Sequence, residues 1–407
     1  MNIILFIGII VFVGFICGEI AGKLKLPKVT GYIIAGVLMD PDIWHFIPKD
    51  FMKHADIVTN IALAFITFSI GGSLFFPHLK RLGKGILYIT VCEAQLAFLA
   101  IFVGFVAILP VFTHIPGATC VATFVPLALL IGSLGAPTDP SPLLAIKQQY
   151  HPEGEVSSTM LSVAAFDDVL GIINYSIAVV IAEALVLHKQ FSVGTTVLQP
   201  FLIIAGSVLL GLVFGFLLNF ITTLIKAEPI GVFIVVLFGL LTGCFGLSTV
   251  VGADELLSVM IMGIVVINYN EKSEKIFKLL EEYLNELIFV FFFTLSGMHL
   301  EFSVLFSAAF LVMFFIILRL AGKFSGVALG AFVAKSSTAV KKYTIGGLVP
   351  QGGIVIGLAL LMRQTPAFEP ISDIIISVII GTTVINEIAG PITTKIALRK
   401  AGELRQE

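Results

Sequence analysis

Long apolar stretches alternate with short polar connections along almost the whole chain. Many stretches have about 18 or more residues, which at about 1.5 Å per residue is enough for a helix to cross ~30 Å of hydrocarbon. The pattern predicts about thirteen membrane-spanning helices, several of them short or interrupted. Their expected limits are 3–22, 29–39, 57–76, 85–110, 120–147, 157–187, 196–225, 230–247, 250–269, 283–299, 303–334, 343–363 and 371–396.

Composition agrees with this interpretation. Of the 407 residues, 58% are hydrophobic and 12% are charged, whereas soluble domains carry about 25% charged residues. The chain is therefore predicted to be an all-α polytopic membrane protein. The first apolar run lacks the basic segment and cleavage site of a signal peptide, so residues 3–22 are expected to remain as a membrane helix. The four cysteines show no CxxC spacing and are interpreted as small buried apolar residues.

Basic residues gather at one end of the predicted helices. Nearly all of them follow odd-numbered spans, and the opposite connections hold few, such as Lys49, Lys189 and Arg363. Cytoplasmic connections of membrane proteins are enriched in Lys and Arg. The N-terminus is therefore predicted outside and the C-terminus in the cytoplasm of a cell (inner) membrane. The residues that carry this prediction are Lys23, Lys25, Lys28, Lys80, Arg81, Lys84, Lys147, Lys226, Lys272, Lys275, Lys278, Lys335, Lys341, Lys342, Lys395, Arg399, Lys400 and Arg405.

The two halves of the chain contain similar motifs in the same order. Phe166–Gly171 and Ile385–Gly390 both read apolar, acid or amide, acid, apolar, small or apolar, glycine. The proline- and glycine-rich stretch 135–142 corresponds in the same way to 346–353. Six spans, one linker span and six more spans would give the halves opposite orientations in the membrane. This plan is the inverted repeat of secondary transporters.

Both of these proline- and glycine-rich stretches predict a helix that is interrupted inside the membrane. Pro137 and Pro140 cannot lie in a continuous helix, because proline removes a backbone donor and clashes with the preceding turn. Thr138 and Asp139 are good N-cap residues, so the helix is expected to end near Gly135 and to restart at Pro140. Interrupted backbone at this depth is tolerated where it lines a watery cavity; a simple proline kink is the alternative. The second break is expected around Pro350, Gln351, Gly352 and Gly353.

Adjacent carboxylates at Asp167 and Asp168 lie within the mostly apolar span 157–187. A charged group at the centre of a membrane helix costs ~2.5–3.5 kcal/mol on insertion scales, so such groups usually have a function. The pair is predicted to bind Na+ or another monovalent cation and a proton in competition, because both neutralise the same carboxylates. The other charges expected in the membrane are Glu93, Glu387, Arg319 and Lys323.

Arg319 and Lys323 are four residues apart and therefore share one face of their helix. One of these two bases is expected to pair with Asp167, which would leave Asp168 for the transported ion. The spacing does not choose between the two bases. For Glu93, a purely structural ion pair is an equally good interpretation.

Together these motifs resemble the monovalent cation/proton antiporter superfamily, and specifically the bacterial Na+/H+ exchangers with a two-aspartate motif. The similarity extends over nearly the whole chain. One departure follows the third span, where many relatives have an acidic residue after glycine and this chain reads Gly71, Gly72, Ser73. The segments that carry the similarity are 26–36, 138–140, 166–168, 252–263, 319–323, 350–353 and 386–391.

The resemblance implies a homodimer with dimerisation helices and a six-helix core, which moves like an elevator around two crossed broken helices. It implies that Asp168 binds the cation and the proton, that Asp167 pairs with the embedded base, and that Thr138 and Asp139 line the crossing. The expected division is 1–84 for the first-repeat scaffold, 85–187 for the first-repeat core, 188–229 for the linker helix, 230–299 for the second-repeat scaffold, and 300–407 for the second-repeat core and cytoplasmic tail.

Exchange of Na+ or Li+ for H+ is the leading hypothesis for the function. Exchange of K+ for H+ is an alternative. Symport of an organic anion is another, although an anion site should present bases or helix N-termini. No HExxH or GxSxG motif is present, so an enzyme is not predicted. The expected partners are the cation, the proton and membrane lipid, with no cofactor and no nucleic acid; the exchange stoichiometry is left open.

Overall fold

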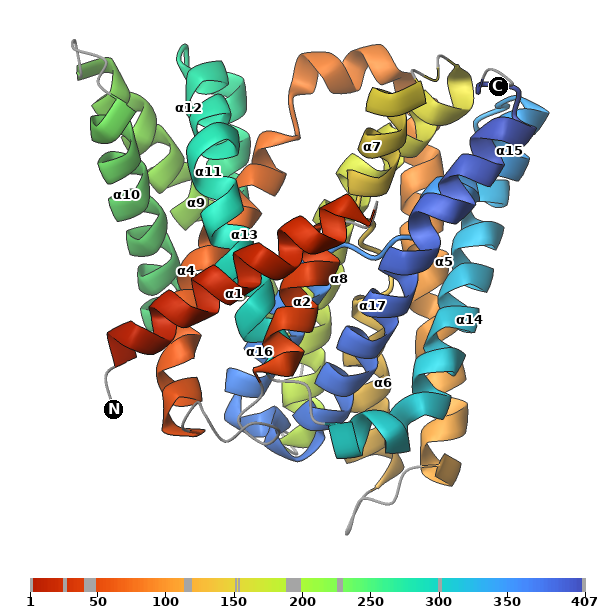
Figure 1. The fold of residues 1–407 in the computed structure, drawn as a ribbon, viewed down its shortest axis with the longest axis horizontal. Helices are drawn as coiled ribbons and strands as arrows, with labels where there is room; N and C mark the ends of the chain where they lie inside the picture. The colour runs from red at the N-terminus through yellow and green to blue at the C-terminus, as the bar shows by residue number, and fades with distance from the viewer. Residues whose placement is uncertain are drawn as a thin grey trace.

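The computed structural model shows long helices that run between two ends of the molecule (Figure 1). It describes residues 3–24, 28–39, 49–112, 119–150, 152, 154–187, 199–224, 230–298 and 302–404. All regular secondary structure in these ranges is helical. The predicted all-α fold class is confirmed.

The helices follow the predicted spans in order. They are α1 (Ile3–Lys23), α2 (Lys28–Leu38), α4 (Lys49–Gly72), α5 (Phe76–Phe112), α6 (Val125–Ser133), α7 (Ser141–Tyr150), α8 (Glu155–Val186), α9 (Gln199–Leu224), α10 (Ile230–Val251), α11 (Glu255–Tyr269), α12 (Ser273–Leu279), α13 (Asn285–Gly297), α14 (Phe302–Val333), α15 (Thr338–Tyr343), α16 (Ile354–Gln364) and α17 (Glu369–Lys400). Short π-helical turns (Cys120–Phe124, Leu280–Leu284) precede α6 and α13, and 3-10 turns (Thr344–Gly347, Pro366–Phe368) precede α16 and α17.

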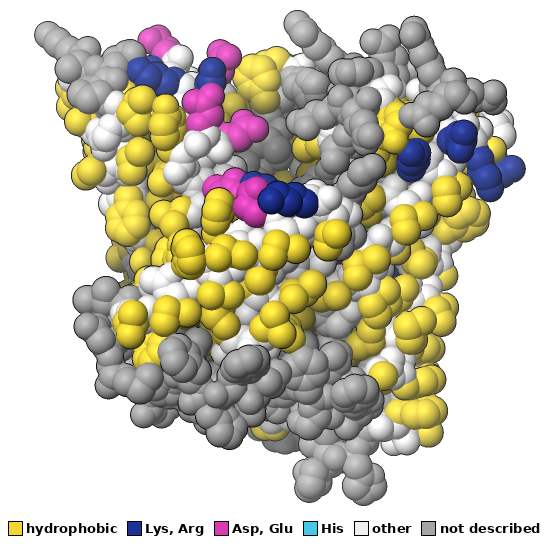
Figure 2. All heavy atoms as spheres, viewed as in Figure 1, with side chains coloured by type: hydrophobic (Ala, Val, Ile, Leu, Met, Phe, Trp, Pro, Cys, Tyr) yellow, Lys and Arg dark blue, Asp and Glu magenta, His cyan; other side chains and the backbone are white. Residues whose placement is uncertain are grey.

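Seven of the described helices are long and apolar enough to cross a membrane, namely α1, α5, α8, α9, α10, α14 and α17. The shorter apolar helices include α2, α11, α16 and the Asp56–Gly72 part of α4. Figure 2 shows hydrophobic side chains across the middle of one face and charged side chains above them. The chain is therefore a multi-pass membrane protein.

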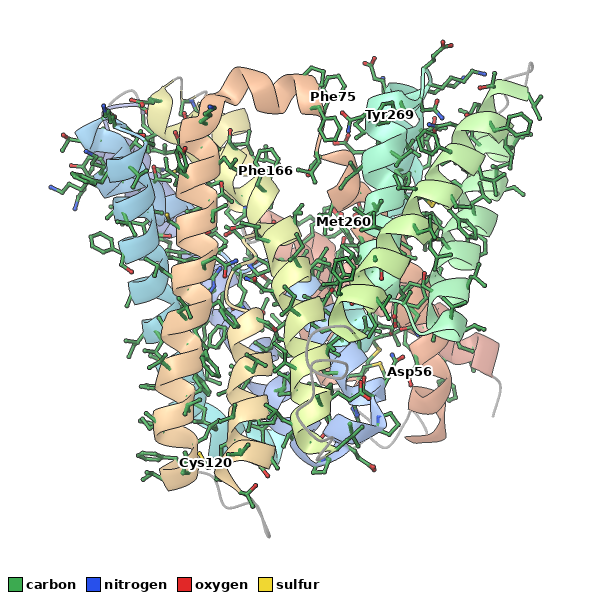
Figure 3. The ribbon with its side chains drawn as sticks, turned by 180° about the vertical axis from the view of Figure 1, so that it is seen from behind. Asp56, Phe75, Cys120, Phe166, Met260 and Tyr269 are labelled. Carbon is green, nitrogen blue, oxygen red and sulfur yellow. The ribbon has the colours of Figure 1, made fainter. Side chains whose placement is uncertain are left out.

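The helix ends that carry the basic residues lie together at one end of the molecule. This end, at the top of Figure 1, holds α12, α15 and the end of α17, with Lys272, Lys341 and Lys400. It is called the basic end below. Figure 3, seen from behind, labels Phe75 and Tyr269 near the basic end and Asp56 and Cys120 near the opposite end.

A row of glycines lets α14 pack directly on α5. A Cβ on Gly322 would lie 2.6 Å from the Cα of Ala97, and a Cβ on Gly326 would lie 2.4 Å from the Cα of Glu93. Small residues at such spacing allow two membrane helices to bring their backbones into contact. This packing places Lys323 of α14 beside Glu93 of α5.

The helices pack in two groups. One consists of α5–α8 and α14–α17, and the other of α1, α2, α4 and α9–α13 (Figures 1 and 3). The groups meet where α4, α9 and α11 face α8, where α4 and α13 face α16, and where α2 faces α17. The interrupted helices of the first group lie next to this boundary.

Candidate functional site

Two helices are interrupted deep inside the molecule. The first break separates α6 from α7 and contains 134–140; the second lies between Thr344–Gly347 and α16 and contains 348–353. The structure places Pro140 in the first segment and Pro350, Gln351 and Gly352 in the second. The two segments touch, because the Gly352 N–H donates to the Pro137 carbonyl at 3.2 Å.

Arg319 holds the two breaks together. Its guanidinium donates to the carbonyls of Gly135 (3.0 Å) and Pro137 (2.9 Å) in the first break. It also donates to the carbonyls of Val349 (2.7 Å) and Pro350 (3.1 Å) in the second. Carbonyls at the end of a helix lack an intrahelical partner and carry partial negative charge, so a buried cation stabilises them.

The sequence allowed either Arg319 or Lys323 to pair with Asp167, and in the structure Arg319 does not form this pair. The side chain is fully buried, and its guanidinium is directed to backbone carbonyls instead of a carboxylate. Its five N–H groups in a planar fork suit this task, because they reach several acceptors at fixed angles.

Lys323 is the base beside Asp167. Its Nζ lies 3.3 Å from Asp167 Oδ2 and forms an ion pair with Glu93. It also donates to the Ala136 carbonyl at 2.6 Å and to Thr138 Oγ1 at 2.8 Å. One buried ammonium thus serves two buried carboxylates, from α5 and α8. Removing such a partner leaves an uncompensated charge in a region without water.

Asp167 is fully engaged in this network. The Thr138 N–H donates to Asp167 Oδ1 at 3.2 Å, and the Thr138 hydroxyl donates to Oδ2. With Lys323 on the same Oδ2, both carboxylate oxygens have partners. Asp167 therefore ties α8 to the first break and to α14.

Asp168 lies in a different environment from its neighbour. Its Oδ1 is buried and has no hydrogen-bond partner among the described residues. The same oxygen is 3.1 Å from the position that a Cβ on Gly352 would occupy. Asp168 also lines a cavity of about 290 Å³, together with Thr138, Asp139 and Gly352. Because one water needs only ~10–15 Å³, this cavity can hold an ion with part of its hydration shell.

The cavity lies on the side of the breaks that faces the basic end. Its lining includes Val29 at the start of α2, Ser73 just after α4 and Asn285 at the start of α13. These three positions belong to helix ends on that side of the molecule. The path from Asp168 therefore leads toward the basic end.

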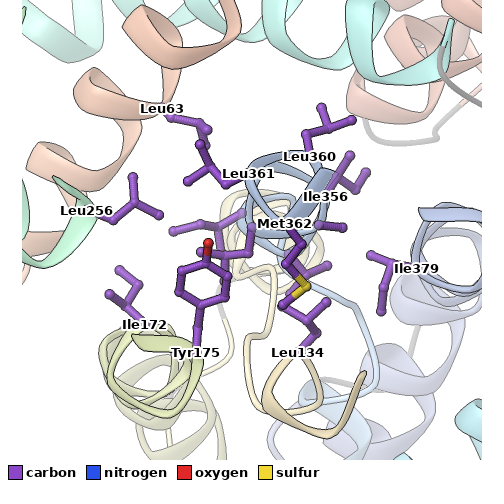
Figure 4. Close-up of a cluster of buried hydrophobic side chains, with 14 of the residues drawn as sticks. Leu63, Leu134, Ile172, Tyr175, Leu256, Ile356, Leu360, Leu361, Met362 and Ile379 are labelled. Atoms are coloured by element: carbon purple, nitrogen blue, oxygen red, sulfur yellow. The ribbon is translucent and has the colours of Figure 1, made fainter. Parts of the chain in front are cut away.

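On the opposite side of the breaks, apolar side chains fill the boundary between the two helix groups (Figure 4). Five of these side chains, which are called the apolar plug below, are buried and come from both groups. They are Leu63 of α4, Leu256 of α11, Ile172 and Tyr175 of α8, and Leu361 of α16. Beyond the plug, Asn60 of α4 and Gln364 of α16 exchange two amide hydrogen bonds of 3.1 Å.

Glu387 and Asp139 form a second carboxyl pair. Glu387 is buried on α17 and lies beside the Asp139 side chain, and its Oε2 has no hydrogen-bond partner among the described residues. Glu387, one of the charges expected in the membrane, therefore lies next to another carboxyl group. Its neighbour Asn386 donates to Gln351 Oε1 at 3.0 Å.

The acid-motif helices of the two repeats pack on their breaks in the same way. A Cβ on Gly171 would lie 2.5 Å from the Pro137 ring, and a Cβ on Gly390 would lie 2.4 Å from the Pro350 ring. In both repeats, the first polar residue of the motif is hydrogen-bonded to the residue that follows this proline. The motif similarity in the sequence therefore corresponds to repeated packing.

A family model described as the transmembrane sodium/hydrogen exchanger matches residues 7–400. The chain belongs to this family. It is similar to probable Na+/H+ antiporter 2 of Methanocaldococcus jannaschii, with 26% identity over 234 residues, which is 56% of this chain and 51% of the relative. Na+/H+ antiporter 1 of the same organism is 24% identical over 208 residues, 51% of this chain and 45% of the relative. The chain thus matches about half the length of these relatives.

The fold of this chain is similar to that of a solved structure, the sodium proton antiporter MjNhaP1 from Methanocaldococcus jannaschii at pH 8. The TM-score is 0.77 at 21% identity, with 98% of this chain and 99% of that chain covered. An electron-microscopy structure of the same antiporter gives 0.74 at 21% identity, with 99% of each chain covered. At this identity the likeness concerns the fold.

The sequence alone did not identify the cavity residues that the second helix group contributes. Ser69 comes from α4, Ser73 directly follows α4, and Asn285 comes from the start of α13. The available signal is the pair of serines, Ser69 and Ser73, at the end of an apolar span. Ser73 also belongs to the segment Gly71, Gly72, Ser73, where the sequence departs from the pattern that the resemblance implies. Its hydroxyl donates to the Ala165 carbonyl at 3.2 Å.

Proposed function

We propose that this exchanger moves Na+ or Li+ across the membrane in exchange for H+, with Asp168 binding one or the other. The observation that carries the proposal is the buried Oδ1 of Asp168, which lacks a hydrogen-bond partner in the described structure and lies at the cavity. Asp167 beside it is occupied by Thr138 and Lys323.

The charges around Asp168 explain why it would exchange one ion for the other. Lys323 already serves Glu93 and Asp167, so the carboxylate of Asp168 needs its own compensation at this depth. A proton supplies it by forming the neutral acid, and a monovalent cation supplies it by coordination. Because both use the same oxygens, arrival of one promotes loss of the other.

Transport also requires that the site open to each side in turn. The cavity leads from Asp168 to the basic end, and the apolar plug fills the other side. We assign the basic end to the cytoplasm, because cytoplasmic segments are enriched in Lys and Arg. Movement of the group α5–α8 and α14–α17 along the other helices would carry Asp168 past the plug in an elevator-like step. The homodimer that the resemblance implies stays a prediction.

Purified protein in vesicles with an acidic interior and a pH-sensitive dye tests the exchange. External Na+ or Li+ should make the interior more alkaline, and Asp168→Asn should abolish the response. Asp373→Asn is the matched control, because Asp373 is an exposed acid on α17 and should keep wild-type exchange. An equal response to K+ would favour K+/H+ exchange. No response of the wild-type protein to any cation across a wide pH range would contradict the proposal.

A further inference from the structure

Gly352 lies directly opposite the unpaired oxygen of Asp168. A Cβ at this position would be 3.1 Å from Asp168 Oδ1, 3.2 Å from Pro137 Cβ and 3.4 Å from the Thr138 nitrogen. Gly352 also lines the cavity that Asp168 faces. A side chain on residue 352 would therefore enter the space beside the carboxylate.

The backbone does not require glycine here. Among the described glycines, only Gly252 and Gly402 have a positive φ, the region that other residues avoid. Gly352 lies outside that region, so alanine could adopt its backbone conformation. What glycine supplies at this position is space.

The other repeat shows what happens when this space is filled. Pro137 and Pro350 occupy equivalent positions, because their rings pack against Gly171 and Gly390. Aligned on these prolines, the breaks read Pro137, Thr138, Asp139 and Pro350, Gln351, Gly352, so Asp139 is the counterpart of Gly352. Likewise Glu387 in Ile385–Gly390 is the counterpart of Asp168 in Phe166–Gly171.

The two repeats differ in whether a side chain occupies the space beside the acid. Beside Glu387 the space is occupied by the side chain of Asp139, although Glu387 Oε2 also has no hydrogen-bond partner in the described residues. At the counterpart, Gly352 has no side chain, and Asp168 Oδ1 remains without a partner in the described residues. The repeat is thus asymmetric where an ion would need room.

We propose that Gly352 is a specificity-determining residue, which leaves beside Asp168 the room that the transported cation occupies and so sets the largest cation accepted. This inference rests on the proposed exchange function. Hard cations take oxygen ligands, and the size of the site selects among them. Narrowing the site from residue 352 should therefore penalise Na+ more than the smaller Li+, and K+ most.

The test compares Gly352→Ala with the wild-type protein in the vesicle assay, with kcat/KM measured for Li+, Na+ and K+. The ratio of kcat/KM for Li+ to that for Na+ should rise about tenfold, the change that accompanies a modest misfit in a site. Gly239→Ala is the matched control, because a Cβ there meets nothing within 4 Å; it should leave the ratio unchanged.

A second variant and a binding readout keep the test decisive if Gly352→Ala folds poorly. Asp168→Glu narrows the same space from the opposite side and should also shift the preference toward Li+. Thermal unfolding in detergent with Li+, Na+ or choline reports binding without transport, because a ligand stabilises the folded state it binds. A folded Gly352→Ala protein with the wild-type Li+/Na+ ratio would overturn the inference and leave the proposed exchange intact. If instead the wild-type protein exchanged no cation, the proposed exchange function itself would be wrong.

Discussion

At the scale of single residues, two bases one helical turn apart on α14 have different tasks. Lys323 places one compact charge between Glu93 and Asp167, and its flexible stem lets it reach both. Arg319 spreads its charge over a planar fork that bridges carbonyls from both breaks. The two side chains are not interchangeable. The lysine ammonium is one compact charge, whereas the guanidinium is a planar fork whose N–H groups reach acceptors in both breaks.

Lys323→Met should destabilise the protein strongly. The change leaves Glu93 and Asp167 buried without their common cation, and breaking a buried pair in this way costs ~3–5 kcal/mol. Thermal unfolding of the purified protein in detergent measures the loss, with the exposed Lys400→Met as control. Adding Glu93→Gln should recover part of the stability, since it removes one of the stranded charges. Unfolding of Lys323→Met at the wild-type temperature would mean that this network contributes little.

At the scale of elements, direct backbone contact between α5 and α14 brings Glu93 and Lys323 together. The glycines of α14 at the contact make this distance possible. Another contact fixes the helix that carries both aspartates. The Glu403 carboxylate accepts from the Val156 and Ser157 N–H groups at 2.7 and 2.9 Å, and so caps the start of α8 with a residue that follows α17.

Gly326→Val should separate α14 from α5. A Cβ alone would lie 2.4 Å from the Cα of Glu93, which is backbone and cannot rotate away. Overpacking of a tight interface costs about 1–3 kcal/mol, and the displacement should also weaken exchange. Gly239→Val on α10 has open space around it and serves as control. The yield of monodisperse protein after gel filtration and the unfolding temperature report the effect; equal values for the two variants would argue against a backbone-limited contact.

At the scale of the whole molecule, the site is open on one side and closed on the other. The closed side has two layers, the apolar plug and the amide pair of Asn60 with Gln364. Both layers join one helix group to the other. An elevator-like step would have to separate them, whereas contacts within each group could persist.

Cross-linking Asn60→Cys to Gln364→Cys should therefore stop exchange. The four native cysteines are first replaced, and a short bifunctional thiol reagent then joins α4 to α16. Vesicle exchange should fall to the level of empty vesicles and should return after reductive cleavage of the linker. Each single-cysteine variant, treated in the same way, controls for modification alone. Full exchange in the cross-linked protein would show that these helices need not separate.

Much of this architecture follows from local rules that a sequence displays. Helix length, the cost of burying charge and the backbone of proline are properties of short segments, so the all-α fold class and the two interrupted helices could be predicted. For the same reason the sequence indicated charges that the structure buries, such as Asp167 and Lys323. The structure confirmed the all-α fold class, and the family model confirmed the recognised family.

The partners of these charges were decided by the tertiary structure. Arg319 and Lys323 lie on the same helix face, so periodicity treats them alike; only the packing of α14 against α5 and the breaks separates their roles. Asp139 lies beside Glu387, and Ser69 lines the cavity, because segments far apart in the chain pack together. Sequence determines what a segment can bury and where it must bend, whereas the distance between two side chains depends on how whole helices pack.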